Sequence, residues 1–163
     1  MSELGLEVIE SSTQKTHEWI GSIAAAAHLE KRNAYKALRA VLHSMRDRLP
    51  LDDAVHFAAQ LPIFLRGLFY DGWEPSKVPV KMSRAEFLES VQQKIVSDQV
   101  IDPLRITHAV FAVIMSFIGI GEMDKLNIVF LKTCKRSSPA GKKSSNNRQD
   151  RQPAAVAATP CEV

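Results

Sequence analysis

Residues Leu61–Trp73, with the sequence LPIFLRGLFYDGW, form the most apolar and aromatic segment of this chain of 163 residues. Pro62 suits the first turn of a helix, because its missing N–H would have no partner there. Gly72 is free to take a positive φ and so to end that helix. We expect the segment to be largely buried by the other helices, because apolar side chains crowd most of its circumference. They are Ile63, Phe64, Leu65, Leu68 and Phe69.

Gly67 interrupts this apolar helix near its middle. Glycine inside a helix costs roughly 1 kcal/mol relative to alanine. We therefore expect another helix to cross closely at that turn, where a side chain would be in the way.

Arg66 is the only charged residue of the short helix, and two interpretations remain open. Its aliphatic stem could lie over the core while its guanidinium reaches the carboxylate of Asp71 or Glu74. Alternatively, it could anchor an anionic ligand, flanked by Tyr70 and Trp73. An arginine beside two amphipathic aromatic residues is also the composition of interface hot spots. Arg66, Tyr70 and Trp73 are thus the candidate interaction residues.

Hydrophobic periodicity predicts helices before the central segment. One begins at Thr13 and places Trp19, Ile20, Ile23 and Ala27 on one face. A second covers residues 31–49, with an apolar face and a charged face that we expect to be solvated. The charged face consists of Lys31, Arg32, Lys36, Arg39, Arg46, Asp47 and Arg48. A third covers residues 52–60, with Asp52 or Asp53 supplying the acceptor and the charge favoured at its start.

Prolines and caps organise the chain after the central segment. Two prolines make residues 74–81 a connector. Ser83 and Glu86 have the spacing of a capping box and open the next helix. Asp102 and Pro103 open the last one, as an N-cap and a first-turn proline. We expect His108 in this helix to be packed or to act as a cap.

The expected fold is an all-α bundle of six or seven helices over residues 13–126. A constant offset of 72 relates Ala37, Ala40, Val41, Leu42 and Ser44 to Ala109, Ala112, Val113, Ile114 and Ser116. This similarity raises the possibility of two related halves, at about 13–73 and 82–126. Residues 1–12 are expected to be frayed, and residues 127–163 to form a disordered basic tail.

The distribution of charge separates the tail from the rest of the chain. The net charge is +3, but residues 125–163 alone carry +6, which leaves −3 for residues 1–124. Attraction to nucleic acid would therefore depend on the tail. Only two cysteines occur, Cys134 and Cys161, so no disulfide framework is expected. We see neither a secretory signal nor an apolar run long enough to span a bilayer, and expect a soluble cytoplasmic protein without membrane attachment.

The sequence AYKALRAVLHSMRDRLPLDDAVHFAAQLPIFLRGLFYDGW, residues 34–73, resembles domain-of-unknown-function family 2267, a group of small bacterial helical proteins. The resemblance continues through RAEFL at residues 84–88 and AVFAV at residues 109–113, and covers about residues 15–126. It implies an all-helical fold and a cytoplasmic bacterial protein. No activity and no catalytic residue come with it, because the family has none assigned.

The chain departs from the family pattern near its end. Members usually close with a helix patterned like LPKDLxALFP, whereas this chain has NIVFLKTCKRSS at residues 127–138. A shifted reading of the codons permits HCLPKDLQALFP. We hypothesise that a frameshift, in the gene or in its sequencing, replaced the final helix from about Asn127.

Catalytic and metal-binding patterns are scarce in the sequence. His43, Asp47, His56 and Asp52 could meet across a turn and bind a divalent metal, but no HxxxH, HExxH or CxxC spacing supports this. Ordinary histidines on a solvated face are the favoured interpretation. No nucleophile elbow, Walker loop or dinucleotide fingerprint is present. We expect no enzyme and no cofactor.

Two functions remain for the fold. The first is a protein-interaction module that binds a protein partner or a second copy of itself, through a surface that includes Arg66, Tyr70 and Trp73. The second is binding of nucleic acid or another anionic surface through the basic tail and the basic side of the second helix.

These two functions respond differently to salt and truncation. If the tail binds an anionic surface, raised salt and deletion of residues 127–163 should abolish binding, because counterion release drives such association. If the aromatic surface binds a protein partner, that interaction should survive the deletion and fail in Trp73→Ala. Binding isotherms at two salt concentrations distinguish the two outcomes.

Overall fold

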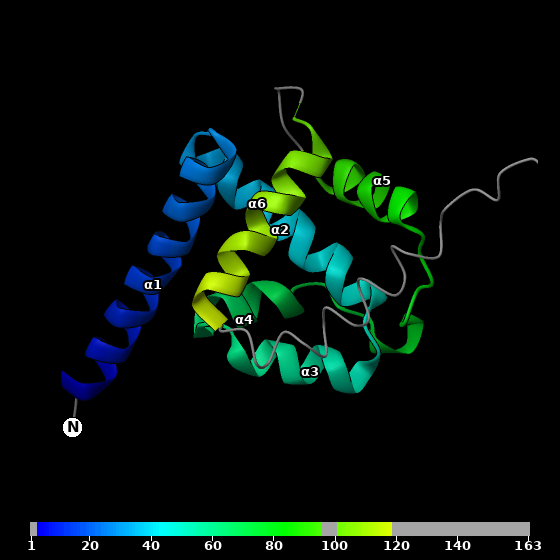
Figure 1. Cartoon of the computed structure of the whole chain (residues 1–163). Coiled ribbons are helices and arrows are strands. Elements are labelled where there is room, and N and C mark those ends of the chain that lie inside the picture. The colour runs from blue at the N-terminus through cyan, green and yellow to red at the C-terminus, as the bar shows by residue number, and fades with distance from the viewer. Residues whose placement is uncertain (1–2, 96–100, 119–163) are drawn as a thin grey trace, which may run out of the picture.

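A computed structural model describes residues 3–95 and 101–118 of the chain (Figure 1). Within these residues it contains six α-helices, one 3-10 helix and no strand, which confirms the predicted all-α fold. In chain order the helices are α1 (Glu3–Ala27), α2 (Lys31–Arg48), α3 (Leu51–Gln60), α4 (Ile63–Tyr70), the 3-10 helix η1 (Pro75–Lys77), α5 (Arg84–Lys94) and α6 (Pro103–Ile118). None of these helices is long and apolar enough to cross a membrane.

Helix α2, rather than the central aromatic segment, lies at the centre of the bundle. It packs against α1, α4, α5 and α6 (Figure 1). Its apolar face is fully buried, with Leu38, Val41 and Leu42 at 0% exposure. Helices of both predicted halves contribute to one hydrophobic core, from Trp19 to Ile114. The proposed duplication of a helical unit remains a prediction.

The expectation that α4 is largely buried is wrong for its outer face. Leu65 and Phe69 are buried, Leu68 is half-buried, and Ile63 and Phe64 are 57% and 47% exposed. With 3.6 residues per turn, a short helix lying against α2 can direct only part of its circumference inward. The apolar residues on its other side are therefore uncovered by the described part of the chain.

The two glycines of this segment have different explanations. Gly72 has a φ of +64°, which confirms the predicted positive-φ helix end. A Cβ at Gly67 would meet no heavy atom of the described residues within 4 Å, apart from its own helix backbone and chain neighbours. The expected close helix crossing at Gly67 is therefore wrong within this part of the chain.

Helix α1 begins at Glu3, ten residues before the predicted start at Thr13. Its second half is anchored by Trp19, Ile23 and Ala27, each at most 2% exposed. Its first turns extend away from the other helices (Figure 1). There, Leu6 and Ile9 are 60% and 54% exposed.

The predicted solvated face of α2 is wrong at Arg46 and Arg48, which are each 5% exposed. Arg46 donates to the carbonyl oxygens of Phe69 and Asp71, at 2.8 Å each, and to the carboxylate of Asp47 at 3.0 Å. Carbonyls at a helix C-terminus lack partners within the helix and carry partial negative charge. They make a suitable environment for the buried guanidinium.

The predicted helix starts are confirmed for α5 and α6 but not for α3. Ser83 Oγ accepts from the Glu86 amide, while the Glu86 carboxylate accepts from the Ser83 amide. An Asp102 carboxylate oxygen accepts from the Leu104 amide at 3.0 Å. At α3, Pro50 occupies the N-cap position, so Asp52 and Asp53 lie in the first turn and contribute charge rather than a capping acceptor.

The predicted tail, residues 127–163, and the hypothesised frameshift lie outside the described residues, as does the beginning of the segment expected to be frayed. These expectations stay predictions.

Replacing Ser83 with alanine should reduce the free energy of unfolding by about 1 kcal/mol, because the Glu86 amide loses its acceptor. Chemical denaturation monitored by circular dichroism measures the change. Ser83→Asp, which restores an acceptor, is the control and should remain within about 0.5 kcal/mol of the wild type. Equal losses in both variants would contradict a capping role.

Candidate functional site

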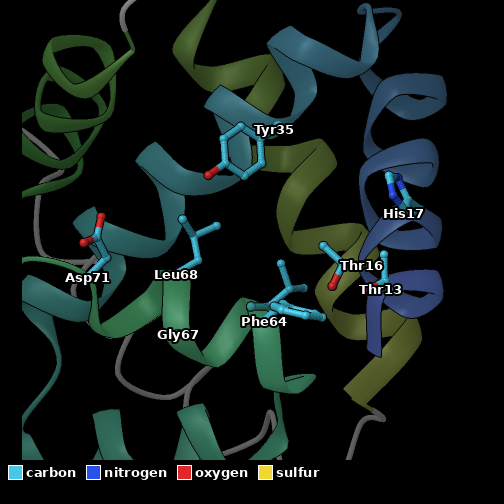
Figure 2. A pocket seen from close by; sticks show the side chains of 9 residues that line it. Thr13, Thr16, His17, Tyr35, Phe64, Gly67, Leu68 and Asp71 are labelled. Carbon is cyan, nitrogen blue, oxygen red and sulfur yellow. The ribbon is translucent and has the colours of Figure 1, made fainter. Parts of the chain in front are cut away.

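A groove of about 500 Å³ lies between α1, α2 and α4 (Figure 2). Helix α4 supplies Phe64, Leu65, Gly67 and Leu68, and Asp71 lies just beyond its end. The rest of the lining is Thr13, Thr16 and His17 of α1 and Tyr35 of α2. Figure 2 shows Phe64 directed toward Thr13 and Thr16 across the groove. Sequence reasoning did not find this site.

The α1 side of the groove is polar in composition but has its hydroxyl donors engaged. Thr13 Oγ1 donates to the Ile9 carbonyl at 2.9 Å, and Thr16 Oγ1 donates to the Ser12 carbonyl at 2.8 Å. Such bonds to the carbonyl four residues earlier are common for threonine in helices. The threonines therefore have no donor hydrogen left for a ligand.

The charge at the end of the groove is compensated within the chain. The Asp71 carboxylate accepts from Arg39 at 2.9 Å. This hydrogen bond holds the pKa of Asp71 below its ordinary value. The Asp71–Arg39 pair closes one end of the groove without leaving an uncompensated carboxylate, so the groove interior is mainly apolar.

His43 fastens α4, one wall of the groove, to α2. It is 6% exposed, and its Nε2 lies 2.7 Å from the Leu68 carbonyl oxygen, so Nε2–H is the donor. Burial is the largest influence on His43 and lowers its pKa, although the Leu68 carbonyl acts in the opposite direction. The expectation that His43 lies on a solvated face is wrong.

Arg66 does not reach the carboxylate predicted for it. Its Nε donates to the Ala58 carbonyl at 3.0 Å, and its Nη2 donates to the carbonyls of Ala59 and Leu61 at 3.0 and 3.2 Å. These are the last carbonyls of α3, which a cation stabilises. The expected pairing with Asp71 or Glu74 is therefore wrong, and Arg66 holds α3 against α4.

Tyr70 and Trp73 are half-buried and pack on the core. Their ring centroids are 5.2 Å apart. Trp73 Nε1 is buried and has no hydrogen-bond partner among the described residues. The helical period places Arg66 and Tyr70 on the side of α4 opposite Phe64 and Leu68. The predicted interaction surface and the groove are thus different faces, and the role of the former stays a prediction.

A serine–lysine cluster between α2 and α5 has a structural explanation. Lys94 Nζ donates to Ser90 Oγ at 2.8 Å and lies 3.2 Å from the Asp47 carboxylate. Ser44 and Ser90 hydroxyl oxygens are 3.0 Å apart. Because Lys94 is engaged with Asp47 as an ammonium donor, it is poorly suited to take a proton from Ser90. The cluster joins the two helices.

The remaining histidines do not assemble a site in residues 3–95 and 101–118. No group of three His, Cys, Asp or Glu residues in this part of the chain is placed to hold a metal ion. His56 is exposed while His43 is buried. His108 is also exposed, so the expectation that it is packed is wrong, while the alternative that it acts as a cap stays a prediction.

One sequence signal could have revealed the groove. Leu6 and Ile9 continue the apolar spacing of Ile20 and Ile23 backward along α1, which favours a helix beginning before Thr13. A longer α1 carries these exposed apolar residues on the same face as Thr13 and Thr16, which line the groove.

Comparison with known proteins adds a family but no activity. Residues 16–129 match the model of a family described as "Uncharacterized conserved protein (DUF2267)". No curated protein matches the chain.

The buried neutral His43 makes stability depend on pH. Because its folded pKa is lowered, its contribution is present above the ordinary value of 6.5 and is lost as the pH falls through the folded pKa. The free energy of unfolding should therefore decrease from about pH 7 to about pH 5. His43→Gln, which keeps a donor for Leu68, should flatten this decrease, whereas the exposed-site control His56→Gln should not. Denaturant titrations at each pH provide the measurement, and identical pH profiles for the wild type and His43→Gln would contradict the assignment.

Proposed function

Since this chain belongs to the DUF2267 family, to which no activity is assigned, we propose a function from its geometry: a protein-interaction module that receives an apolar helix in the groove between α1 and α4. The observation that carries the proposal is the concentration of exposed apolar side chains around a concave site. A cytoplasmic bacterial setting, expected from the sequence, is part of the proposal.

Exposed apolar residues in the groove and beyond its end on α1 support binding of a helix. In the lining, Phe64 is 47% exposed and Tyr35 41%, while Leu6 and Ile9, at 60% and 54%, continue the helix face of Thr13 and Thr16 past the groove. Isolated exposed apolar residues are normal on a monomer, whereas a contiguous apolar surface indicates an interaction site. Helices commonly bind by placing an apolar face in such a groove.

The groove's chemistry favours binding over catalysis. The hydroxyls of Thr13 and Thr16 donate to their own helix, and Asp71 is paired with Arg39. His17 is exposed at the rim. The groove thus offers shape and apolar contact rather than an activated nucleophile with its base.

The groove replaces the aromatic surface as the proposed binding site. Nε and Nη2 of Arg66 donate to carbonyls at the end of α3, and the rings of Tyr70 and Trp73 pack on the core. Phe64 and Leu68, on the opposite side of α4, line the groove. The geometry therefore favours the latter face.

Binding to an anionic surface has less support from the described residues. Arg46 and Arg48, two of the cations counted on the second helix, are buried. The exposed basic residues of α2 are concentrated in its first turns and at Arg39, which is paired with Asp71.

Phe64→Ser tests the groove against a matched control. Val55 on α3 has nearly the same exposure as Phe64, 48% against 47%, but does not line the groove. Amphipathic helical peptides selected on the wild-type protein should lose at least about tenfold in affinity for Phe64→Ser, since an aromatic anchor is removed. They should bind Val55→Ser within about twofold of the wild type.

Fluorescence anisotropy with labelled peptides measures the affinities, and thermal unfolding verifies that both variants are folded. Failure to select any peptide that depends on Phe64 would overturn the proposed function.

A further inference from the structure

The groove has a positively charged end at the start of α2. Tyr35, the α2 residue of its lining, is 41% exposed. Lys31 and Arg32 precede Tyr35 by four and three residues, spacings that place side chains next to each other on one side of a helix. Both cations are exposed. The side of α2 that borders the groove therefore carries exposed positive charge within about one turn of the lining.

Helix stability does not account for Lys31 and Arg32. The start of a helix carries partial positive charge, so acidic side chains are favoured there, yet the first turn of α2 contains no acidic residue. Among the described residues, neither cation forms an ion pair. Glu30, just before the helix, makes no capping hydrogen bond and can offset only one of the two charges. The start of α2 thus keeps a net positive charge that is available to a partner.

The opposite end of the groove is acidic. Figure 1 shows α1 extending from its junction with α2 to first turns that point away from the other helices, so the beginning of α1 lies away from Lys31 and Arg32. Glu10 precedes Thr13 of the lining by three residues and is exposed on the same side of α1. The charge along the groove therefore changes sign between the start of α2 and the beginning of α1.

The remaining charges near the groove leave this polarity in place. At 3.6 residues per turn, Lys15 and Glu18 each lie roughly 150° around α1 from the middle of its three lining residues. Arg39 and Asp71 pair with each other at 2.9 Å. Each of these pairs combines one positive and one negative charge, so neither adds net charge to the groove.

We propose that the groove binds an amphipathic helix whose apolar face ends in acidic side chains, and that these side chains bind beside Lys31 and Arg32. This inference rests on the proposed function and specifies the chemistry of its partner. Apolar residues of that helix contact Phe64 and Tyr35, while the charges at the end of the groove select among helices and raise the association rate. Glu10 disfavours negative charge at the other end, so the site selects a helix with one acidic end rather than a continuous polyanion.

Charge reversal in peptides tests the position of the acidic end. Helical peptides that bind in a Phe64-dependent manner are selected from a library with a fixed apolar face and randomised residues at both ends. The selected peptides should carry Asp or Glu at one end. Changing these residues to Lys should weaken binding to the wild type at least about fivefold, because an attraction becomes a repulsion.

Lys31→Glu/Arg32→Glu should reverse this preference and bind the lysine peptide more tightly than its acidic parent. Lys81→Glu/Arg84→Glu is the matched control, because these exposed cations also lie near a helix start, that of α5, and line no part of the groove. The control makes the same change in net charge and should keep the wild-type preference within about twofold. Fluorescence anisotropy measures each affinity, and the preferences should diminish at raised salt, which screens exposed charges.

The charge reversal on α2 should not damage the fold. Glutamate at the start of a helix is favoured by the partial positive charge there, so thermal unfolding of Lys31→Glu/Arg32→Glu should show equal or greater stability than the wild type. A reversed peptide preference in a stable variant therefore reports the charge beside the groove.

The inference and the proposed function can fail separately. Phe64-dependent peptides without acidic residues at one end, or a preference that Lys31→Glu/Arg32→Glu leaves unchanged, would overturn the acidic partner while the helix-binding function stands. Self-association of the full chain that a selected peptide competes away would identify a second copy as the occupant and also overturn the acidic partner. If no Phe64-dependent peptide is selected, both proposals are overturned.

Discussion

Two side chains of α2 bind the carbonyl groups near the end of α4, and the position of the groove depends on them. His43 donates to Leu68, and Arg46 donates to Phe69 and Asp71. The carbonyls at a helix end have no partners in the helix itself, and burying them unpaired is costly. By satisfying these carbonyls from one direction, α2 determines which face of α4 points into the core and which remains outside.

A side chain also binds helix-end carbonyl groups between α3 and α4. Arg66 donates to the final carbonyls of α3, so a charge that resembled a ligand anchor in the sequence connects consecutive helices instead. Arginine suits this role because its planar group directs several donors at neighbouring acceptors and remains charged when partly buried. Polar contacts at helix ends thus position α4, while the apolar contacts of Leu65 and Phe69 hold it to the core.

The uncovered surface follows from this arrangement. With one face of α4 turned toward α2, Phe64 on another face is exposed and lies across the groove from Thr13 and Thr16 of α1 (Figure 2). The resulting groove is bounded by α1, α2 and α4, and the described part of the chain leaves Phe64 on α4 and Leu6 and Ile9 on α1 exposed. Association with a partner at this surface would be favourable, because it would remove from water the apolar area that the fold leaves exposed.

Local sequence determined the helices and several of their ends. Apolar spacing marked α2 and α6, Ser83 and Glu86 marked the start of α5, and Gly72 marked the end of α4. These features depend on residues within one or two turns of each other, so a sequence displays them directly.

Only the tertiary structure decided that Arg46 is buried, that Phe64 is exposed and that Gly67 borders a groove. Each outcome depends on contacts between helices distant in the chain: a buried charge needs carbonyls from another helix, and an apolar side chain on a short helix is covered only if a second helix lies over it. Residue type and spacing indicate whether a side chain favours a buried or an exposed environment. The packing of the helices determines which side chains are in fact buried.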